Sequence, residues 1–213
     1  MKTEQIGFWS GDFGKEYTDR NNWDFDGWNA FYKETWGVTK LEINQPLLDA
    51  LPKDARILEV GCNIGLQLKG LQQQGFTNLY GIELQAYAVE KAKSVTKGMN
   101  IIQGSGFDIP FKDGFFDLVL TNGVLIHIAP KDLPKIMQEI YRCSKQYISG
   151  FEYYAEEVVD LNYRGNKGFL WKADYSKLYQ KEFSDLKEVK RDFYPYIKES
   201  EKGNVDYFYL LKK

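Results

Sequence analysis

The sequence predicts an α/β fold in which helices cover both faces of a mostly parallel seven-stranded sheet. From about Arg56, short apolar runs alternate with amphipathic runs, which is typical of parallel strands joined by right-handed helical crossovers. Near the end of the chain, two strand-like runs flank a polar turn with glycine, which predicts an antiparallel hairpin at the sheet edge. The first 50 residues are helical in places and are expected to cover the carboxyl edge of the sheet.

The bulk composition is that of one ordinary soluble domain. Charged residues make up 27% of the 213 residues and hydrophobic residues 43%, and the formal net charge is −2. This balance gives no electrostatic footprint for nucleic acid or for an anionic membrane surface, so neither is expected as a partner. No internal repeat or long linker divides the chain, and we expect a single domain over residues 1–213.

The cysteine and histidine counts bear on the compartment and on metal binding. Cys62 and Cys143 are the two cysteines, and their placement favours reduced thiols and a cytoplasmic location over a disulfide. The N-terminus has no apolar signal region, and no run approaches the roughly 18 apolar residues that a membrane span needs. With His127 as the single histidine and no C-x-x-C pair, no metal site is expected.

Strands and helices alternate through the first half of the core. The expected strands are RILEV (56–60), NLYGIE (78–83) and MNIIQG (99–104). The expected helices between them are GLQLKGLQQQ (65–74) and QAYAVEKAKSV (85–95). Gly75 ends the first of these helices, and Ala88, Ala92 and Val95 share one face of the second.

The alternation continues and then gives way to the hairpin. The expected strands are FFDLVLTNG (115–123), QYISGFEY (146–153), LKEVKRDFYPY (186–196) and VDYFYLLKK (205–213). The expected helices are DLPKIMQEIYRCS (132–144), FLWKADYSKLYQKEF (169–183) and, near the N-terminus, TKLEINQPLLDAL (39–51). Asp132 is the expected N-cap of helix 132–144, and Pro134 falls in its first turn. The apolar face of that helix comprises Leu133, Ile136, Met137, Ile140 and Tyr141.

A bend with two glycines follows the first strand. In an open parallel sheet, ligands bind outside the carboxyl ends of the strands. Gly61 and Gly65 allow close approach to the backbone, and the free N–H groups of the next helix face the same place. Glu83 ends the second strand, 22 residues after Gly61, where a carboxylate can accept hydrogen bonds from a ribose diol. Together these features predict a site for a nucleoside-containing cofactor.

The pattern of the bend distinguishes between cofactors. It reads E-x-G-x-N-x-G and departs from the G-x-G-x-x-G of dinucleotide sites, which disfavours NAD. It resembles motif I of the class I S-adenosylmethionine-dependent methyltransferases, commonly [DE]-x-G-x-G-x-G. The segment QGSGFDIPFKDGFFDLVLTNGVLIHI (103–128) is similar to that family's third-to-fourth-strand segment. The resemblance covers roughly Leu51 to Phe151. It implies a Rossmann-like methyltransferase fold with S-adenosylmethionine as cofactor and S-adenosylhomocysteine as product.

Two positions depart from the family pattern. Asn63 replaces the middle glycine, and asparagine is the non-glycine residue that best tolerates a left-handed backbone. Ser105 stands where the family often has an aspartate that contacts the adenine amine. The adenine contact would then fall to the serine hydroxyl or to a neighbouring backbone group.

The resemblance divides the expected domain and implies its cofactor-binding residues. The divisions are a helical N-terminal cap (1–50), a cofactor-binding core (51–151) and an acceptor-side insertion with the hairpin (152–213). The implied cofactor-binding residues are Trp9, Tyr17, Arg20, Glu59, Gly61, Cys62, Asn63, Gly65, Glu83, Leu84, Gly104, Ser105, Gly106, Phe107, Asn122 and Gly123. Cys62 is interpreted as a small packing residue. The alternatives are that the glycines serve an ordinary turn and that Glu83 is a solvated acid.

The flanks resemble a smaller group. FWSGDFGKEYTDRN, TNGVLIHI, FEYY and YRGNKGFLWKADY are similar to the methyltransferases associated with pseudaminic acid biosynthesis. This resemblance implies a small-molecule acceptor, namely a surface-sugar precursor of the nonulosonic acid type or a nucleotide-linked sugar. The expected acceptor-side residues are Phe13, Tyr153, Arg164, Trp171, Lys172 and Asp174. Arginine and lysine near aromatic rings suit an anionic sugar, and surface salt bridges explain the same charges equally well.

Several residues and functions keep two interpretations. His127 and Glu152 are candidate general bases, with a core or capping imidazole as the alternative for His127. The aromatic residues of segment 8–17 either pack an N-terminal helix or form a lid over the ligands. Rival functions are methylation of another metabolite or of a protein side chain, and non-catalytic binding of S-adenosylmethionine by a regulatory or partner protein.

Overall fold

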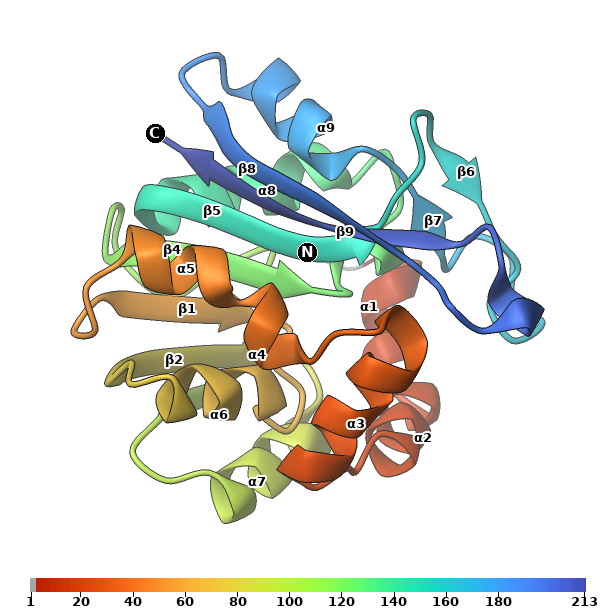
Figure 1. Cartoon of the computed structure of the whole chain (residues 1–213), viewed down its shortest axis with the longest axis horizontal. Helices are drawn as coiled ribbons and strands as arrows, with labels where there is room; N and C mark the ends of the chain where they lie inside the picture. Colours follow the sequence, from red (N-terminus) through yellow and green to blue (C-terminus); the bar gives the residue numbers. More distant parts are fainter. Residues whose placement is uncertain (1–2) are drawn as a thin grey trace.

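A seven-stranded sheet lies at the centre of the molecule, which a computed structural model describes over residues 3–213 (Figure 1). The strand order is β3-β2-β1-β4-β5-β9-β8. The strands are β1 (Arg56–Val60), β2 (Asn78–Glu83), β3 (Asn100–Gln103), β4 (Phe116–Asn122), β5 (Ser144–Tyr153), β8 (Lys187–Pro195) and β9 (Val205–Lys212). The first five pair in parallel, and β9 is antiparallel to both β5 and β8. The predicted parallel sheet with a C-terminal antiparallel hairpin is confirmed.

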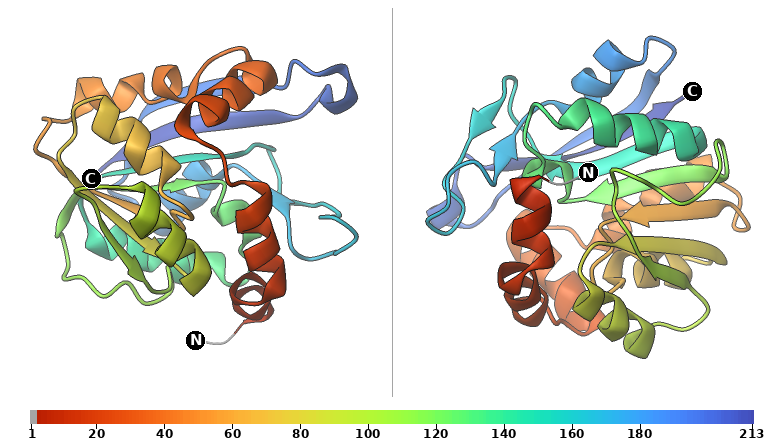
Figure 2. Two further views of the ribbon diagram at one scale, coloured as in Figure 1. Left: turned by 90° about the horizontal axis from the view of Figure 1, so that it is seen from below. Right: turned by 180° about the vertical axis from the view of Figure 1, so that it is seen from behind.

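Helices pack on both faces of this sheet (Figures 1 and 2). The α-helices of the described residues are α1 (Glu4–Ser10), α2 (Asp12–Arg20), α3 (Phe25–Trp36), α4 (Lys40–Ile43), α5 (Gln45–Ala50), α6 (Leu66–Gln73), α7 (Ala86–Val95), α8 (Leu133–Cys143) and α9 (Tyr175–Glu182). One hydrophobic cluster packs the helices from α3 through α7 against one face of the sheet. A second cluster packs α8 and α9 against the other face. In β1, Ile57 belongs to the first cluster and Leu58 to the second, because successive strand residues point to opposite faces.

The N-terminal helices α1 and α2 form a cap beside the ends of the strands (Figure 2). Gln85, just before α7, donates hydrogen bonds from Nε2 to the carbonyls of Ser10 and Gly11, both at 3.0 Å. A Cβ at Gly14 would lie 1.8 Å from the carbonyl oxygen of Trp9, so α1 and α2 pack backbone against backbone. Hydrogen bonds therefore hold the cap against the start of α7, in addition to its covalent connection to α3.

Two predicted helices have different bounds in the structure. TKLEINQPLLDAL forms two short helices, α4 and α5, which meet at Asn44. In FLWKADYSKLYQKEF, Trp171–Lys172 forms strand β7, which pairs with β6 (Val159–Asp160). The helix begins only at Tyr175, because the side chain of Asp174 accepts a capping hydrogen bond from the N–H of Lys177.

Two side chains also differ from prediction. Val95 is 46% exposed, because it is the last residue of α7 and lies beyond the part that packs on the sheet. Asp132 occupies the N-cap position of α8, but its side chain makes no capping hydrogen bond. The prediction that Val95 shares the buried face of α7 was wrong. Asp132 is the N-cap residue of α8, as predicted, but it caps the helix without a side-chain hydrogen bond.

Candidate functional site

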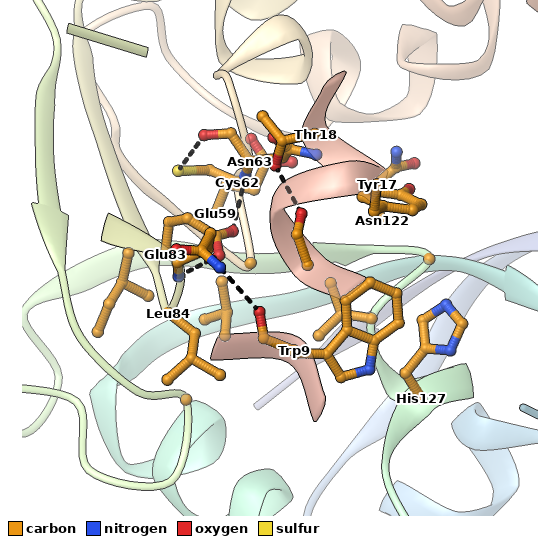
Figure 3. Close-up of a pocket in the computed structure, with 18 of the residues that line it drawn as sticks. Trp9, Tyr17, Thr18, Glu59, Cys62, Asn63, Glu83, Leu84, Asn122 and His127 are labelled. Atoms are coloured by element: carbon orange, nitrogen blue, oxygen red, sulfur yellow. Dashed lines mark hydrogen bonds between the residues drawn. The ribbon is translucent and has the colours of Figure 1, made fainter. Parts of the chain in front are cut away.

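A cavity of about 270 Å³ opens at the carboxyl ends of β1, β2 and β4, beneath the N-terminal helices (Figure 3). Its walls come from the bend after β1, the end of β2, the loops after β3 and β4, and α1 to α3. Aromatic side chains of the N-terminal helices line it, namely Trp9, Tyr17, Trp28, Phe31 and Tyr32. Within residues 3–213, Glu59 and Glu83 are its acidic lining side chains, and no lysine or arginine lines it.

The bend after β1 brings main chain into the cavity wall. Gly61 has φ +72°, and a Cβ there would lie 2.7 Å from a methyl carbon of Val124. Asn63 has φ +44°, in the left-handed region expected for this position. Gly65 has φ +79° and precedes α6, but it does not line the cavity. Backbone conformation requires the two glycines, and close packing adds a second reason at Gly61.

Cys62 lines the cavity, and its side chain packs against β2. It is buried, and a Cβ built on Gly81 of β2 would lie 2.6 Å from its Sγ. Burial raises the pKa of the Cys62 thiol well above its ordinary value. This environment is that of a packing residue whose thiol stays protonated.

The carboxylate of Glu83 connects the bend to the end of β2. Its oxygens accept hydrogen bonds from the N–H of Asn63 at 2.9 Å and of Gln85 at 2.8 Å. Burial raises the pKa of Glu83, and these N–H groups act in the opposite direction. Each carboxylate oxygen has a second lone pair, so Glu83 can also accept hydrogen bonds from the hydroxyls of a ribose.

Three lining side chains present buried polar atoms to a ligand. Trp9 Nε1, Glu59 Oε2 and Asn63 Oδ1 have no hydrogen-bond partner among the described residues. Buried polar atoms without partners cost free energy, so a ligand with complementary groups gains from filling this space. A nucleoside joined to an amino acid offers hydroxyl and ammonium donors for the two acceptors. The residues present therefore fit S-adenosylmethionine.

The loop after β3 forms the wall next to Glu83. Gly104, Ser105, Gly106 and Phe107 all line the cavity, as does Leu84. A Cβ at Gly106 would lie 2.8 Å from a side-chain carbon of Val60 and 2.9 Å from one of Ile136. The Oγ of Ser105 accepts a hydrogen bond from the N–H of Phe107 at 3.2 Å, which leaves the hydroxyl hydrogen for a ligand.

Trp9 and Tyr17 reach the cavity from the cap. Their rings meet edge to face with centroids 5.2 Å apart, and the Trp9 ring lies 4.5 Å from the ring of His127 (Figure 3). Burial raises the pKa of Tyr17, so its hydroxyl stays a hydrogen-bond donor. Arg20 does not line the cavity: its side chain is exposed, pairs with Glu16 at 3.4 Å and lies 5.3 Å from the ring centroid of Phe13.

His127 lines the cavity from the 3₁₀ turn Leu125–His127 after β4. Its Nδ1 lies 2.7 Å from the carbonyl oxygen of Phe169, and a carbonyl only accepts, so Nδ1 carries the hydrogen. The Nε2 lone pair is then free. Burial lowers the pKa of His127 to about 4, against the effect of the Phe169 carbonyl, so the ring is neutral near pH 7.

Glu152 lies behind the cavity wall rather than in it. The side chain is buried, does not line the cavity, and accepts hydrogen bonds from the N–H groups of Val124, Leu125 and Ile126 at 3.2 to 3.4 Å. Burial raises its pKa to about 7, although these main-chain hydrogen bonds act in the opposite direction. The geometry assigns Glu152 to holding the loop after β4 and does not support a role as a base.

The six expected acceptor-side residues do not line the cavity. Phe13 stacks on Phe8 with ring centroids 4.0 Å apart, and Arg164 is exposed in the loop between β6 and β7. Tyr153 has the ammonium of Lys172 5.4 Å from its ring centroid. These side chains therefore lie outside the cavity lining.

The other members of that set are engaged in local structure. Trp171 is buried, and its carbonyl accepts a hydrogen bond from the hydroxyl of Tyr175 at 3.0 Å. Lys172 donates to Asn204 Oδ1 at 2.5 Å. Asp174 caps α9 and pairs with Arg191 at 2.8 Å. Salt bridges and helix capping therefore account for the Asp174 charge.

Sequence reasoning missed Tyr32, which lines the cavity, and Lys40, which lies behind its wall; both form a polar cluster with Asn122. The Nζ of Lys40 donates to Asn122 Oδ1 at 2.7 Å, and Asn122 Nδ2 donates to the Tyr32 hydroxyl at 3.1 Å. Asn122 and Gly123, two of the expected cofactor-binding residues, line the cavity. The nearby Thr39–Glu42 capping box marks where α4 begins, but no local pattern indicates that Lys40 points inward.

Residues 3–213 contain no group of histidine, cysteine, aspartate and glutamate side chains that would hold a metal ion. No helix among them has the length and apolar character needed to cross a membrane.

Known proteins resemble this chain in sequence and fold. Residues 58–147 match the family model described as a methyltransferase domain. Norajmaline N-methyltransferase of Rauvolfia serpentina is 30% identical over 100 residues, which cover 44% of this chain and 34% of that protein. Peramine synthetase of Metarhizium rileyi is 29% identical over 165 residues, which cover 64% of this chain. The chain spans only 34% and 6% of the lengths of these two relatives.

Solved structures share the fold. A methyltransferase of Methanosarcina mazei aligns with a TM-score of 0.66 at 16% identity, covering 79% of this chain and 96% of that one. A Leishmania major methyltransferase aligns with a TM-score of 0.66 at 20% identity, covering 81% and 71%. Both are described as dependent on S-adenosylmethionine. The matched segment shows that residues 58–147 are similar to a methyltransferase domain, and the solved structures show that this chain shares the fold of S-adenosylmethionine-dependent methyltransferases.

Proposed function

We propose that this protein transfers a methyl group from S-adenosylmethionine to a small-molecule acceptor. The observation that carries the proposal is that the E-x-G-x-N-x-G bend, Glu83 and the loop after β4 line one cavity at the carboxyl edge of the sheet. When bound, the cofactor supplies a methyl group on a positively charged sulfur, which an acceptor heteroatom displaces to leave S-adenosylhomocysteine.

The side chains around the bend would hold the cofactor. The Glu83 carboxylate accepts from ribose hydroxyls while it keeps its bonds to the main chain. The free oxygens of Glu59 and Asn63 accept from donors at the amino-acid end. Trp9 and Tyr17 close the cavity from above and exclude water, which strengthens each polar contact inside.

His127 would accept a hydrogen bond or a proton from the acceptor. Its ring lines the cavity, and the Nε2 lone pair is available because the carbonyl of Phe169 holds the hydrogen on Nδ1. An acceptor hydroxyl or amine that gains a methyl group must lose a proton, and Nε2 takes it. With a pKa of about 4, His127 is a weak base, so its main effect is to orient the acceptor heteroatom.

The narrower proposal is that the acceptor is a surface-sugar precursor of the nonulosonic acid type or a nucleotide-linked sugar. Its support is the sequence resemblance of the flanks. Since no lysine or arginine lines the cavity within residues 3–213, the reacting end of the acceptor is neutral. Tyr163 places its ring 5.0 Å from the His127 ring, so its exposed neighbour Arg164 can meet an anionic group outside the cavity.

Two measurements test this function. Calorimetry with S-adenosylhomocysteine tests the cofactor, and Gly61→Val, which places a side chain against Val124, should abolish the binding. Incubation with labelled S-adenosylmethionine and panels of neutral, carboxylated and nucleotide-linked sugars, followed by mass spectrometry, tests the acceptor. Wild-type protein that fails to bind S-adenosylhomocysteine contradicts the proposal. Binding without methylation of any sugar, metabolite or protein favours the non-catalytic alternative.

A further inference from the structure

Lys40 is a cation buried directly behind the cavity wall. It is 2% exposed and begins α4, where the Thr39–Glu42 capping box fixes the helix start. Its Nζ lies 2.7 Å from the neutral amide oxygen of Asn122 and 4.1 Å from the ring centroid of Phe151. In the described part of the chain, Lys40 forms no ion pair within 4.0 Å. A buried ammonium with a neutral partner is costly, so its presence beside a ligand cavity calls for a function.

The contacts of Lys40 determine how the neighbouring groups are oriented. An ammonium only donates, so Asn122 Oδ1 must face Lys40 and Nδ2 must face the hydroxyl of Tyr32, 3.1 Å away. Having accepted that bond, Tyr32 keeps its own hydrogen to donate. The one protein oxygen in its range among residues 3–213 is Asn122 Oδ1 at 3.4 Å, which already accepts from Lys40.

Through this chain of hydrogen bonds, the charge of Lys40 polarises groups at the cavity surface. Tyr32 and Asn122 line the cavity, whereas Lys40 does not. Each donor in such a chain polarises the next, so the Tyr32 hydroxyl becomes a stronger donor than an isolated phenol. The geometry gives the cavity a hydrogen-bond donor directed at a negatively charged or carbonyl oxygen.

We propose that Lys40, acting through Asn122, positions the Tyr32 hydroxyl to bind the carboxylate at the amino-acid end of S-adenosylmethionine. This inference rests on the proposed function. A carboxylate in the cavity needs charge-assisted donors, and no lysine or arginine of residues 3–213 lines the cavity. Arg20, which the resemblance includes among the cofactor-binding residues, is exposed and lies over the ring of Phe13.

The charges around Lys40 are consistent with this role. Burial lowers its pKa to about 7, while Glu59 on β1, Asp206 on β9 and Glu152 on β5 raise it. The side chain therefore retains its charge over part of the neutral range. The competing explanation is that Lys40 only balances these buried carboxyl groups, in which case its removal affects all ligands equally.

Two ligands that differ by the carboxylate alone separate these explanations. The probes are S-adenosylmethionine and decarboxylated S-adenosylmethionine, with affinities measured by calorimetry on the full chain. We expect Lys40→Met and Tyr32→Phe each to weaken the binding of S-adenosylmethionine about 10- to 100-fold. The binding of the decarboxylated probe should weaken less than about threefold. Lys33→Met, which removes an equal charge from the exposed side of α3, should change neither affinity.

The pair of variants also tests the connection between the two residues. Because they act through one chain, the Lys40→Met/Tyr32→Phe double variant should lose no more affinity than the larger single effect. Additive losses, equal losses for both probes, or unchanged affinities overturn the inference. Tyr32→Phe preserves the shape of the ring and keeps the test valid if Lys40→Met does not fold, as judged by circular dichroism. Wild-type protein that binds neither probe overturns the proposed function itself.

Discussion

The imidazole of His127 donates a hydrogen bond from Nδ1 to the main-chain carbonyl of Phe169, 2.7 Å away. The two residues are 42 positions apart, and the contact joins the loop after β4 to the segment just before β7. It holds the ring in one tautomer at the cavity wall. The first two predictions follow from this contact.

Replacing His127 should slow methyl transfer and leave cofactor binding unchanged. Because the proposed function has Nε2 of this cavity-lining residue contact the acceptor, His127→Ala should lower kcat by about 10² or more for a hydroxyl acceptor, and by less for an amine. Single-turnover kinetics measure the first effect, and calorimetry with S-adenosylhomocysteine measures binding. Full turnover by His127→Ala on the natural acceptor contradicts the role.

The same residue should make the folded state sensitive to acid. The folded pKa of about 4 is below the unfolded value of 6.5, so the stabilising contribution is complete above pH 6.5 and is lost as the pH falls towards 4. The full loss is about 3 kcal/mol at most. Urea unfolding of wild type and His127→Gln at several pH values measures it. The difference between the two free energies of unfolding should shrink on acidification, and a constant difference refutes the prediction.

Gly61→Ala should destabilise the protein more than a similar change at Gly37. Both glycines have positive φ, but only at Gly61 would the new Cβ meet a neighbour, the Val124 side chain at 2.7 Å. Backbone strain alone costs about 1 kcal/mol or slightly more, and the clash adds a further amount of about 1–3 kcal/mol. Urea unfolding compares the two variants. Val124→Ala combined with Gly61→Ala should recover part of the lost stability. Equal destabilisation at the two glycines would mean that the Val124 side chain moves aside at no cost.

Gln85→Leu should loosen the cap. Its Nε2 donates to the carbonyls of Ser10 and Gly11 and, at 3.4 Å, to that of Trp9. Their loss should speed hydrogen exchange in residues 4–20 and weaken S-adenosylhomocysteine binding severalfold. Gln72→Leu is the control, since Gln72 donates at 2.9 Å to the Lys97 carbonyl, away from the cap. Equal exchange in the two variants would show that the cap is held by other contacts.

The parts of the site that lie within one strand–bend–helix unit could be predicted from sequence. The bend from Glu59 to Asn63, with Glu83 at the end of the next strand, has a pattern set by local backbone geometry and by the parallel sheet. Asn63 illustrates this, because its left-handed conformation is a property of the residue itself.

The rest depended on tertiary packing that no local pattern encodes. Arg164, Lys172 and Asp174 follow strand five in sequence, but they are exposed or engaged with other side chains. Lys40 lies in a short segment between two caps and gives no sign of its burial. Glu152 was predicted only as a candidate base, because the direction of its carboxylate depends on three main-chain N–H groups of the loop after β4.

The concentration of tryptophan near the N-terminus gives the protein a built-in optical reporter. Four of the five tryptophans fall within the first 36 residues, and Trp9, Trp23 and Trp28 line the cavity. Most of the intrinsic fluorescence therefore originates at or near the ligand site. Occupancy of the cavity can be titrated from the emission of unlabelled protein, and substituting Trp9 alone would separate the signal of the cap from that of α3.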